Sequence, residues 1–246
     1  MTLNLLVVVC GFLIGFFVIS TGGGGAALYL GVLTGLCGLS AAHAVDTSLL
    51  TAIPALCFGA LSFYLHGNVN VKLARQFLYF ALPTVIVASL LARYIPENIY
   101  APLIGLVLVV LGVQMYFRKV RQTEDIHVDR VKAAYYAILS GLMIGIGGLS
   151  GGGVIVAGLL AMGEDMLGTV ATSSFILVWT SLIGAVMHMT GGGVSYFYAL
   201  LLIIGSVTGA LIAPRVLSRV NRATFDRICK PVISLIVILM GLQMIF

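Results

Sequence analysis

The sequence has very few charged residues. Asp, Glu, Lys and Arg make up 9% of its 246 residues, against about 25% in an average soluble domain. None precedes Asp46, and none lies in the stretches 133–163 and 166–214. The mean hydropathy is +1.16. Together these absences exclude a soluble globular protein, and we expect most of the chain to lie in a lipid bilayer.

Other absences narrow the class further. The four cysteines, Cys10, Cys37, Cys57 and Cys229, lack the spacing of a metal site and are interpreted as small buried hydrophobes. The chain shows no nucleotide-binding motif. Its net charge of +5 sits in loops between apolar segments, which indicates membrane topology and not nucleic-acid binding. We therefore expect no cofactor, no metal and no nucleic-acid partner.

The apolar segments predict an all-α integral membrane protein. A spanning helix needs about 20 apolar residues. The candidate segments are 3–20, 24–39, 47–65, 76–93, 99–117, 132–149, 153–163, 168–189, 195–213 and 226–246. The second and the seventh are short, and each directly follows a run of glycines. This pattern is typical of a helical hairpin that is broken by glycine, either re-entrant or formed by two tilted crossings.

Two glycine runs interrupt the apolar segments. One follows two hydroxyl residues at Ser20-Thr21-Gly22-Gly23-Gly24-Gly25, and the other is Ser150-Gly151-Gly152-Gly153. Each glycine costs about 1 kcal/mol relative to alanine inside a helix, so consecutive glycines predict a break. Broken backbone at membrane depth is tolerated only where protein buries it or where it lines a cavity.

The chain contains an internal repeat. The order of five short motifs is kept between the halves, at an offset between 125 and 130 residues. The matched segments are 11–15 with 141–145, the serine-glycine runs, 45–48 with 170–173, 59–60 with 184–185, and 112–117 with 241–246. We interpret the chain as a first transmembrane repeat (1–118), a cytoplasmic linker (119–131) and a second transmembrane repeat (132–246).

Basic residues indicate how the two repeats are oriented. If each glycine-broken segment enters the membrane and returns, twelve of the thirteen Lys and Arg residues share one face, and only Arg93 lies opposite. A single crossing would instead divide them seven to six. The positive-inside tendency favours the first arrangement. It predicts two inverted repeats, each a glycine-broken hairpin plus three transmembrane helices, in the inner (plasma) membrane with both termini outside.

The two breaks predict an anion site near the middle of the membrane. The helix after each break begins with unpaired N–H groups and carries about half a positive charge at its start, and such ends attract anions. Inverted repeats with broken helices are typical of secondary transporters. Thr47-Ser48 and Thr172-Ser173 are interpreted as beginning the next helix of each half. The predicted substrate-binding residues are Ser20, Thr21, Gly22, Gly23, Gly24, Gly25, Thr47, Ser48, Ser150, Gly151, Gly152, Gly153, Thr172 and Ser173.

Simpler roles compete at several of these positions. Serine and threonine also serve as helix caps or packing residues. Spaced glycines, as in Gly11/Gly15, Gly31/Gly35, Gly141/Gly145 and Gly205/Gly209, are typical of close helix packing, and we assign them to packing. Asp46 precedes an apolar segment and is interpreted as its N-cap. Its counterpart in the second repeat is Ala171, which argues against a coupling role shared by both halves.

These motifs resemble a known family. The Ser/Thr-Gly-Gly-Gly motifs in both halves, the Thr-Ser that follows each, and the Gly-x-Gln-Met ends are similar to those of the TauE/SafE family, also called the 4-toluene sulfonate uptake permease family. The resemblance covers nearly the whole chain. It implies transport of sulfur-containing anions such as sulfite, thiosulfate-like species or organosulfonates including sulfoacetate. Because the chain shows no nucleotide-binding motif, we expect the driving force to be an ion gradient, with H⁺ or Na⁺ as the coupling ion, or the substrate gradient itself. We also expect a homodimer.

Three functions compete on the sequence alone. The leading interpretation is a secondary carrier of small sulfur anions that works by alternating access and is not an enzyme. The second is an intramembrane serine protease of the rhomboid kind, with Ser150 as nucleophile and His188 as base. The third is a passive anion channel of the same architecture. The duplicated serine-glycine motif argues against the protease, because catalysis does not need a second copy.

Overall fold

The computed structural model of the protein describes residues 2–22, 24–39, 41–92, 94, 129–147, 150–188 and 193–217, with scattered positions between 102 and 117 and between 231 and 242. All regular structure in these residues is helical. Five helices are long and apolar enough to cross a membrane. The expected all-α membrane fold is therefore confirmed. Of the predicted spans 99–117 and 226–246 only these scattered positions are described, and they are helical, while most of the linker 119–131 lies outside the described residues.

Eight helices have defined bounds, and their order follows the predicted segments. They are α1 (Thr2–Thr21), α2 (Ala26–Gly35), α3 (Ala41–Leu65), α4 (Val71–Ala92), α6 (Arg130–Gly147), α7 (Gly152–Ala161), α8 (Met166–His188) and α9 (Tyr196–Leu217). α1 ends at Thr21 and α2 begins at Ala26, while α6 ends at Gly147 and α7 begins at Gly152. Both predicted breaks are confirmed. The two helices that follow them, α2 and α7, are only 10 residues long.

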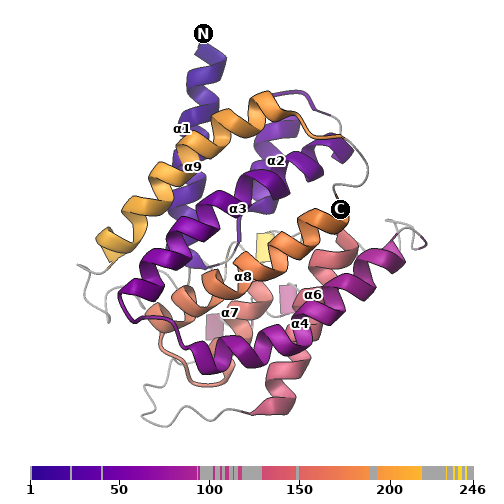
Figure 1. The fold of residues 1–246 in the computed structure, drawn as a ribbon, viewed down its shortest axis with the longest axis vertical. Helices are drawn as coiled ribbons and strands as arrows, with labels where there is room; N and C mark the ends of the chain where they lie inside the picture. The colour runs from indigo at the N-terminus through magenta and orange to yellow at the C-terminus, as the bar shows by residue number, and fades with distance from the viewer. Residues whose placement is uncertain are drawn as a thin grey trace.

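The helices exchange partners between the two halves of the chain. In Figure 1, α3 and α8 lie side by side at the centre, with α1 and α9 together on one side and α4 and α6 together on the other. α3 also packs against α9, and α8 packs against α4 in the same way. Because α1 corresponds to α6 and α4 to α9 in the sequence repeat, each outer pair joins one helix from each half.

Spaced glycines bring the outer pairs together. A Cβ added to Gly11 would lie 2.7 Å from the carbonyl oxygen of Leu202, and one added to Gly15 would collide with the carbonyl of Ser206. Glycine here lets the α1 and α9 backbones touch, as predicted. Both partners advance by four residues, so α1 and α9 run in the same direction.

The repeat-equivalent glycines do the same in the second half. A Cβ on Gly141 would lie 3.0 Å from the carbonyl oxygen of Ala81, and one on Gly145 would lie 2.7 Å from that of Val85. α4 and α6 therefore also run parallel and in close contact. Gly31 and Gly35 differ, because no described atom lies within 4 Å of a Cβ built there. The described residues give these two glycines no packing partner, contrary to expectation.

The distribution of side chains suits a lipid solvent. Many large apolar side chains are exposed, for example Leu5, Leu65 and Tyr79. Hydroxyl side chains lie inside, and the fully or nearly fully buried ones are Thr47, Ser48, Thr51, Ser140, Thr169, Thr172, Ser173, Ser174, Thr180 and Ser206. In a bilayer an apolar exterior costs nothing, whereas each interior hydroxyl needs a partner. Most of these hydroxyls have a hydrogen-bond partner among the described residues, whereas those of Ser140 and Thr169 have none there.

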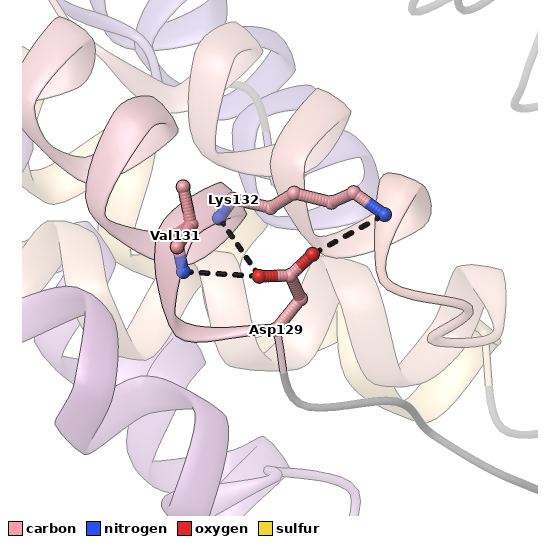
Figure 2. Close-up of polar contacts among 3 residues, drawn as sticks. All are labelled: Asp129, Val131 and Lys132. Carbon is pink, nitrogen blue, oxygen red and sulfur yellow. Dashed lines mark hydrogen bonds and ion pairs between the residues drawn. The ribbon is translucent and has the colours of Figure 1, made fainter.

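The charged linker ends in an ordinary helix cap. The Oδ1 of Asp129 accepts hydrogen bonds from the backbone N–H groups of Val131 (3.0 Å) and Lys132 (3.3 Å), and its Oδ2 lies 3.4 Å from the Lys132 Nζ (Figure 2). The bonds from Lys132 and Val131 lower the pKa of this exposed carboxyl. Asp129 thus starts α6 in a solvated position, as expected for an acidic residue of the linker.

Candidate functional site

The first break requires glycine at two positions for different reasons. Gly22 and Gly24 adopt φ values of 63° and 73°, which side chains of L-residues rarely tolerate. Gly22 also lies so close to α8 that a Cβ would come within 2.9 Å of the Cα of Val170. Ser20, Thr21, Gly22 and Gly25 are all buried, as broken backbone in a membrane must be.

The two breaks meet each other. A Cβ added to Gly24 would collide with the Oγ of Ser150, which belongs to the second break. The Oγ of Ser173 donates a 2.6 Å hydrogen bond to the carbonyl oxygen of Gly22. The structure therefore brings the first break against two segments that lie more than a hundred residues further along the sequence: the second break and the first turns of α8.

The start of α7 lies in this contact region. Gly152 donates its N–H to the Oγ of Ser150 at 3.4 Å, and every residue from Gly152 to Leu160 is buried. The residue before α7 is Gly151, which has no side chain to cap the helix. No residue of either break carries a charge, so the positive potential that helix N-termini provide is not supplemented by a cationic side chain of the breaks.

Ser140 is a candidate site residue that sequence reasoning missed. It lies on α6 and is fully buried, and its Oγ has no hydrogen-bond partner among the described residues. A Cβ on Gly151 would collide with that Oγ, so the hydroxyl lies against the beginning of α7. An unpaired buried hydroxyl costs about 1–3 kcal/mol. The available signal was a serine directly before Gly141, at the position that Cys10 holds in the first repeat.

Most of the predicted hydroxyl ligands already have structural bonds. Ser20 and Thr21 donate to the carbonyl oxygens of Phe16 (2.7 Å) and Phe17 (3.0 Å), one turn earlier in α1. Such bonds are the usual arrangement for hydroxyls within helices. These two hydroxyl hydrogens therefore do not point to a ligand in this conformation, and the same holds for the hydrogen of Ser173.

Thr47 and Thr172 each accept a hydrogen bond from the other half of the chain, at equivalent positions of the repeat. The Thr47 Oγ1 accepts a hydrogen bond from the backbone N–H of Ser195 at 3.0 Å. The Thr172 Oγ1 accepts one from the backbone N–H of Asn70 at 2.9 Å. Thr47 and Thr172 are 125 residues apart, and so are Asn70 and Ser195. The first turns of each central helix thus lie beside the segment that follows the other central helix.

Three expectations about the starts of these helices are wrong. Thr47 and Thr172 do not begin α3 and α8, which start six residues earlier at Ala41 and Met166. Asp46 accordingly lies inside α3 and is not its N-cap. The alanines after position 40 are strong helix formers and extend α3 upstream. α8 also begins upstream of Thr172, but for a different reason: Asp165 caps the helix by accepting the N–H of Gly168 at 2.8 Å.

Two further predicted site residues are buried, and one lies outside the described residues. Ser48 is buried beside Thr47 in α3, and Gly153 is buried in the first turn of α7. Gly23 lies outside the described residues. So does the side chain of His188, although its backbone ends α8. The Ser150–His188 pair of the protease interpretation therefore lies outside what the structure describes.

Comparison with known proteins identifies the family. The family model described as "Sulfite exporter TauE/SafE" matches residues 7–244. The chain belongs to the TauE/SafE family. The two proteins of Bacillus subtilis named "Probable membrane transporter protein" YjnA and YunE are each 23% identical to it, covering 97% and 82% of this chain and 98% and 80% of their own lengths. A protein of Sinorhizobium fredii with the same description, y4hK, is 26% identical over 96% of this chain and 98% of its own.

Membership decides between the function classes. TauE/SafE proteins are membrane transporters and not enzymes, so the protein is a multi-pass membrane transporter, and the rhomboid-type interpretation is excluded. The resemblance drawn from the glycine motifs is confirmed. A transporter of this family implies a small-molecule substrate and a lipid bilayer as partners.

Proposed function

We propose that this TauE/SafE protein is a secondary carrier of small sulfur-containing anions. The substrates we have in view are sulfite, thiosulfate-like species and organosulfonates such as sulfoacetate. The observation that carries the proposal is the contact between Gly24 and Ser150, which joins the two breaks into one buried, uncharged region. A site without a fixed cation holds an anion moderately and releases it readily, as a carrier requires.

The anion is held by backbone and hydroxyl donors. The N-terminal turns of α2 and α7 supply N–H groups, since the first four of any helix lack partners within it. The Ser140 hydroxyl, which has no partner among the described residues and lies beside Gly151, supplies a further donor. Gly22, Gly24, Gly25, Gly151, Gly152 and Gly153 allow close approach. Ser20, Thr21, Thr47, Ser48, Thr172 and Ser173 frame the site in this conformation and become available only if their present bonds open.

In the proposed alternating-access mechanism the two repeats have inverted orientations in the membrane. Two observations support this orientation. The outer helices pair across the halves, and the Thr47–Ser195 and Thr172–Asn70 bonds occupy equivalent positions of the two repeats. Under this proposal each bond lies toward a different membrane face, and each must open in turn. The proposal includes a plasma-membrane location with both termini outside, an H⁺ or Na⁺ gradient as driving force, and a homodimer.

Counterflow in proteoliposomes tests the carrier against the channel. Vesicles loaded with unlabelled sulfite, thiosulfate or sulfoacetate should accelerate the uptake of the labelled anion, and the uptake should saturate. A passive channel gives no such trans-stimulation. Absence of counterflow for all three anions, with intact protein in the vesicles, would reject the proposed substrate class.

A further inference from the structure

The turn between α7 and α8 carries a buried carboxylate. Glu164 is 7% exposed, and among the described residues it is the only charged side chain that is buried. Glu164 and Asp165 are also the only charged residues between positions 133 and 214. Burying a carboxylate is costly unless it is paired or protonated. The groups around Glu164 therefore decide whether its carboxyl is paired with a cation or protonated.

Asn70 is the partner of this carboxylate. Its Nδ2 donates to the Oε2 of Glu164 at 2.9 Å, its backbone N–H donates to Thr172, and its Oδ1 accepts the N–H of Leu73 at 3.2 Å. One residue thus joins the α7–α8 turn, the first turn of α4 and the first turns of α8. The chain of contacts continues to the site, because Ser173, next to Thr172, donates to the carbonyl of Gly22 in the first break.

No cation neutralises Glu164 in the described structure. The one ion pair found among the described residues is Lys132 with Asp129. The basic residues on the neighbouring helices, Lys72 and Arg75 of α4 and Arg130 and Lys132 of α6, are exposed. On its own turn the nearest charge is Asp165, which is negative. Burial raises the pKa of Glu164, the Asn70 bond opposes this rise, and the charge of Asp165 adds to it.

We propose that Glu164 binds the proton that accompanies the anion, and that its protonation weakens the Asn70 contact between the halves. The proposal rests on the carrier function above. A proton from water forms an O–H bond at a Glu164 carboxyl oxygen, and the carboxylate becomes neutral. This removes a negative charge from the element that contacts the anion site, so proton binding and anion binding favour each other. When that face opens, water hydrates Glu164 and the proton leaves.

Transport assays with matched variants test the coupling. Glu164→Gln keeps the size and the hydrogen-bond acceptor for Asn70 but cannot ionise. Asp165→Asn is the control, because it changes the neighbouring carboxylate and keeps an acceptor for Gly168. Thiosulfate and sulfoacetate are the probes, since sulfite itself titrates near neutral pH. We expect an imposed proton gradient to accelerate net uptake severalfold in wild type and Asp165→Asn, and not in Glu164→Gln, whose counterflow persists. Full stimulation in Glu164→Gln would overturn the proposal.

A measurement without transport keeps the two proposals separate. Infrared difference spectra of purified protein should show a protonated carboxyl band that titrates above the ordinary glutamate range. The band should be missing in Glu164→Gln and present in Asp165→Asn. A wild type without this band would refute the proton site even if the anion is carried. A wild type with the band but without counterflow would refute the carrier function and leave the proton site standing.

Discussion

Gly24 lies directly against Ser150, so the two breaks that interrupt the helices of each half touch at one point. Neither residue is charged, and both lie in backbone that a bilayer tolerates only inside protein. This contact explains why glycine is needed at position 24 even apart from its φ of 73°. It also provides a direct way to separate backbone strain from contact between the breaks.

Gly24→Ala should destabilise the protein more than Gly38→Ala. Both glycines have positive φ, 73° and 66°, so both substitutions strain the backbone by about 1–2 kcal/mol. Gly38 faces no described atom within 4 Å, whereas a Cβ on Gly24 meets Ser150. Thermal unfolding in detergent should show the larger loss for Gly24→Ala, with part of it recovered in Gly24→Ala/Ser150→Gly. Equal losses at both positions would mean that the breaks do not press on each other.

Ser140→Ala should separate stability from affinity. Removing an unpaired buried hydroxyl should leave the unfolding temperature unchanged or raise it, because no hydrogen bond is lost. The half-saturation concentration for counterflow should nevertheless rise severalfold. Thr180→Val is the control, since its buried hydroxyl donates a hydrogen bond to the carbonyl oxygen of Ile176 at 3.1 Å and Thr180 is not among the proposed substrate-binding residues. An unchanged half-saturation concentration in Ser140→Ala would remove Ser140 from the site.

Thr172→Val and Thr47→Val should each loosen a different segment of the molecule. Each leaves a backbone N–H without its partner, that of Asn70 or that of Ser195, at a cost of about 1–3 kcal/mol. Hydrogen–deuterium exchange should rise in peptide 66–75 for Thr172→Val and in peptide 193–200 for Thr47→Val. The serine variants keep the hydroxyl and should resemble wild type. Identical exchange patterns in the two valine variants would contradict independent contacts.

Alanine at Gly15 or Gly145 should separate the outer helix pairs. A Cβ at Gly15 meets the Ser206 carbonyl of α9, and one at Gly145 meets Val85 and Ala88 of α4. Overpacking of this kind costs about 1–3 kcal/mol. Gly31→Ala is the control, because it faces open space among the described residues and should be neutral or stabilising. Unfolding temperatures in one detergent provide the comparison, and an equal loss in Gly31→Ala would refute the packing role.

The stability of the wild type should fall as pH rises above the ordinary range of glutamate. The folded-state pKa of Glu164 is raised, mainly by burial. The folded protein therefore binds this proton more tightly than the unfolded chain does. Its contribution is complete below the unfolded pKa and is lost as pH rises through the folded pKa. Glu164→Gln should flatten this part of the stability curve, and an unchanged slope would show that Glu164 ionises normally.

Local sequence features predicted much of this architecture. Consecutive glycines indicated both breaks, although Gly152 and Gly153 of the second run form the first turn of α7. Spaced glycines indicated packing surfaces on α1, α6 and α9 but not their partner helices. The segment 47–65 began six residues after the start of α3 at Ala41, since hydropathy follows the lipid-exposed span, whereas the segment 168–189 began two residues after the start of α8 at Met166. The placement of Thr172 at the start of α8 was wrong by six residues.

The polar contacts between the halves could not be predicted from the sequence. The Asn70–Thr172 and Ser195–Thr47 bonds join a backbone N–H to a side chain more than a hundred residues away, and any residue except proline carries such an N–H. Ser140 and Glu164 did have a signal. One is a serine directly before a repeated glycine motif, and the other is an acidic residue in a long stretch that is otherwise almost free of charge.

The proposed anion site where the two breaks meet is tested most directly by ligand-induced thermal shifts of purified protein. A ligand at 100 times its Kd stabilises by about 2.7 kcal/mol. Sulfite, thiosulfate and sulfoacetate should raise the unfolding temperature of the wild type and of Thr180→Val, while acetate and phosphate should not. The shift should be lost in Ser140→Ala/Ser150→Ala. A full shift retained in this double variant would place the anion elsewhere and contradict the account.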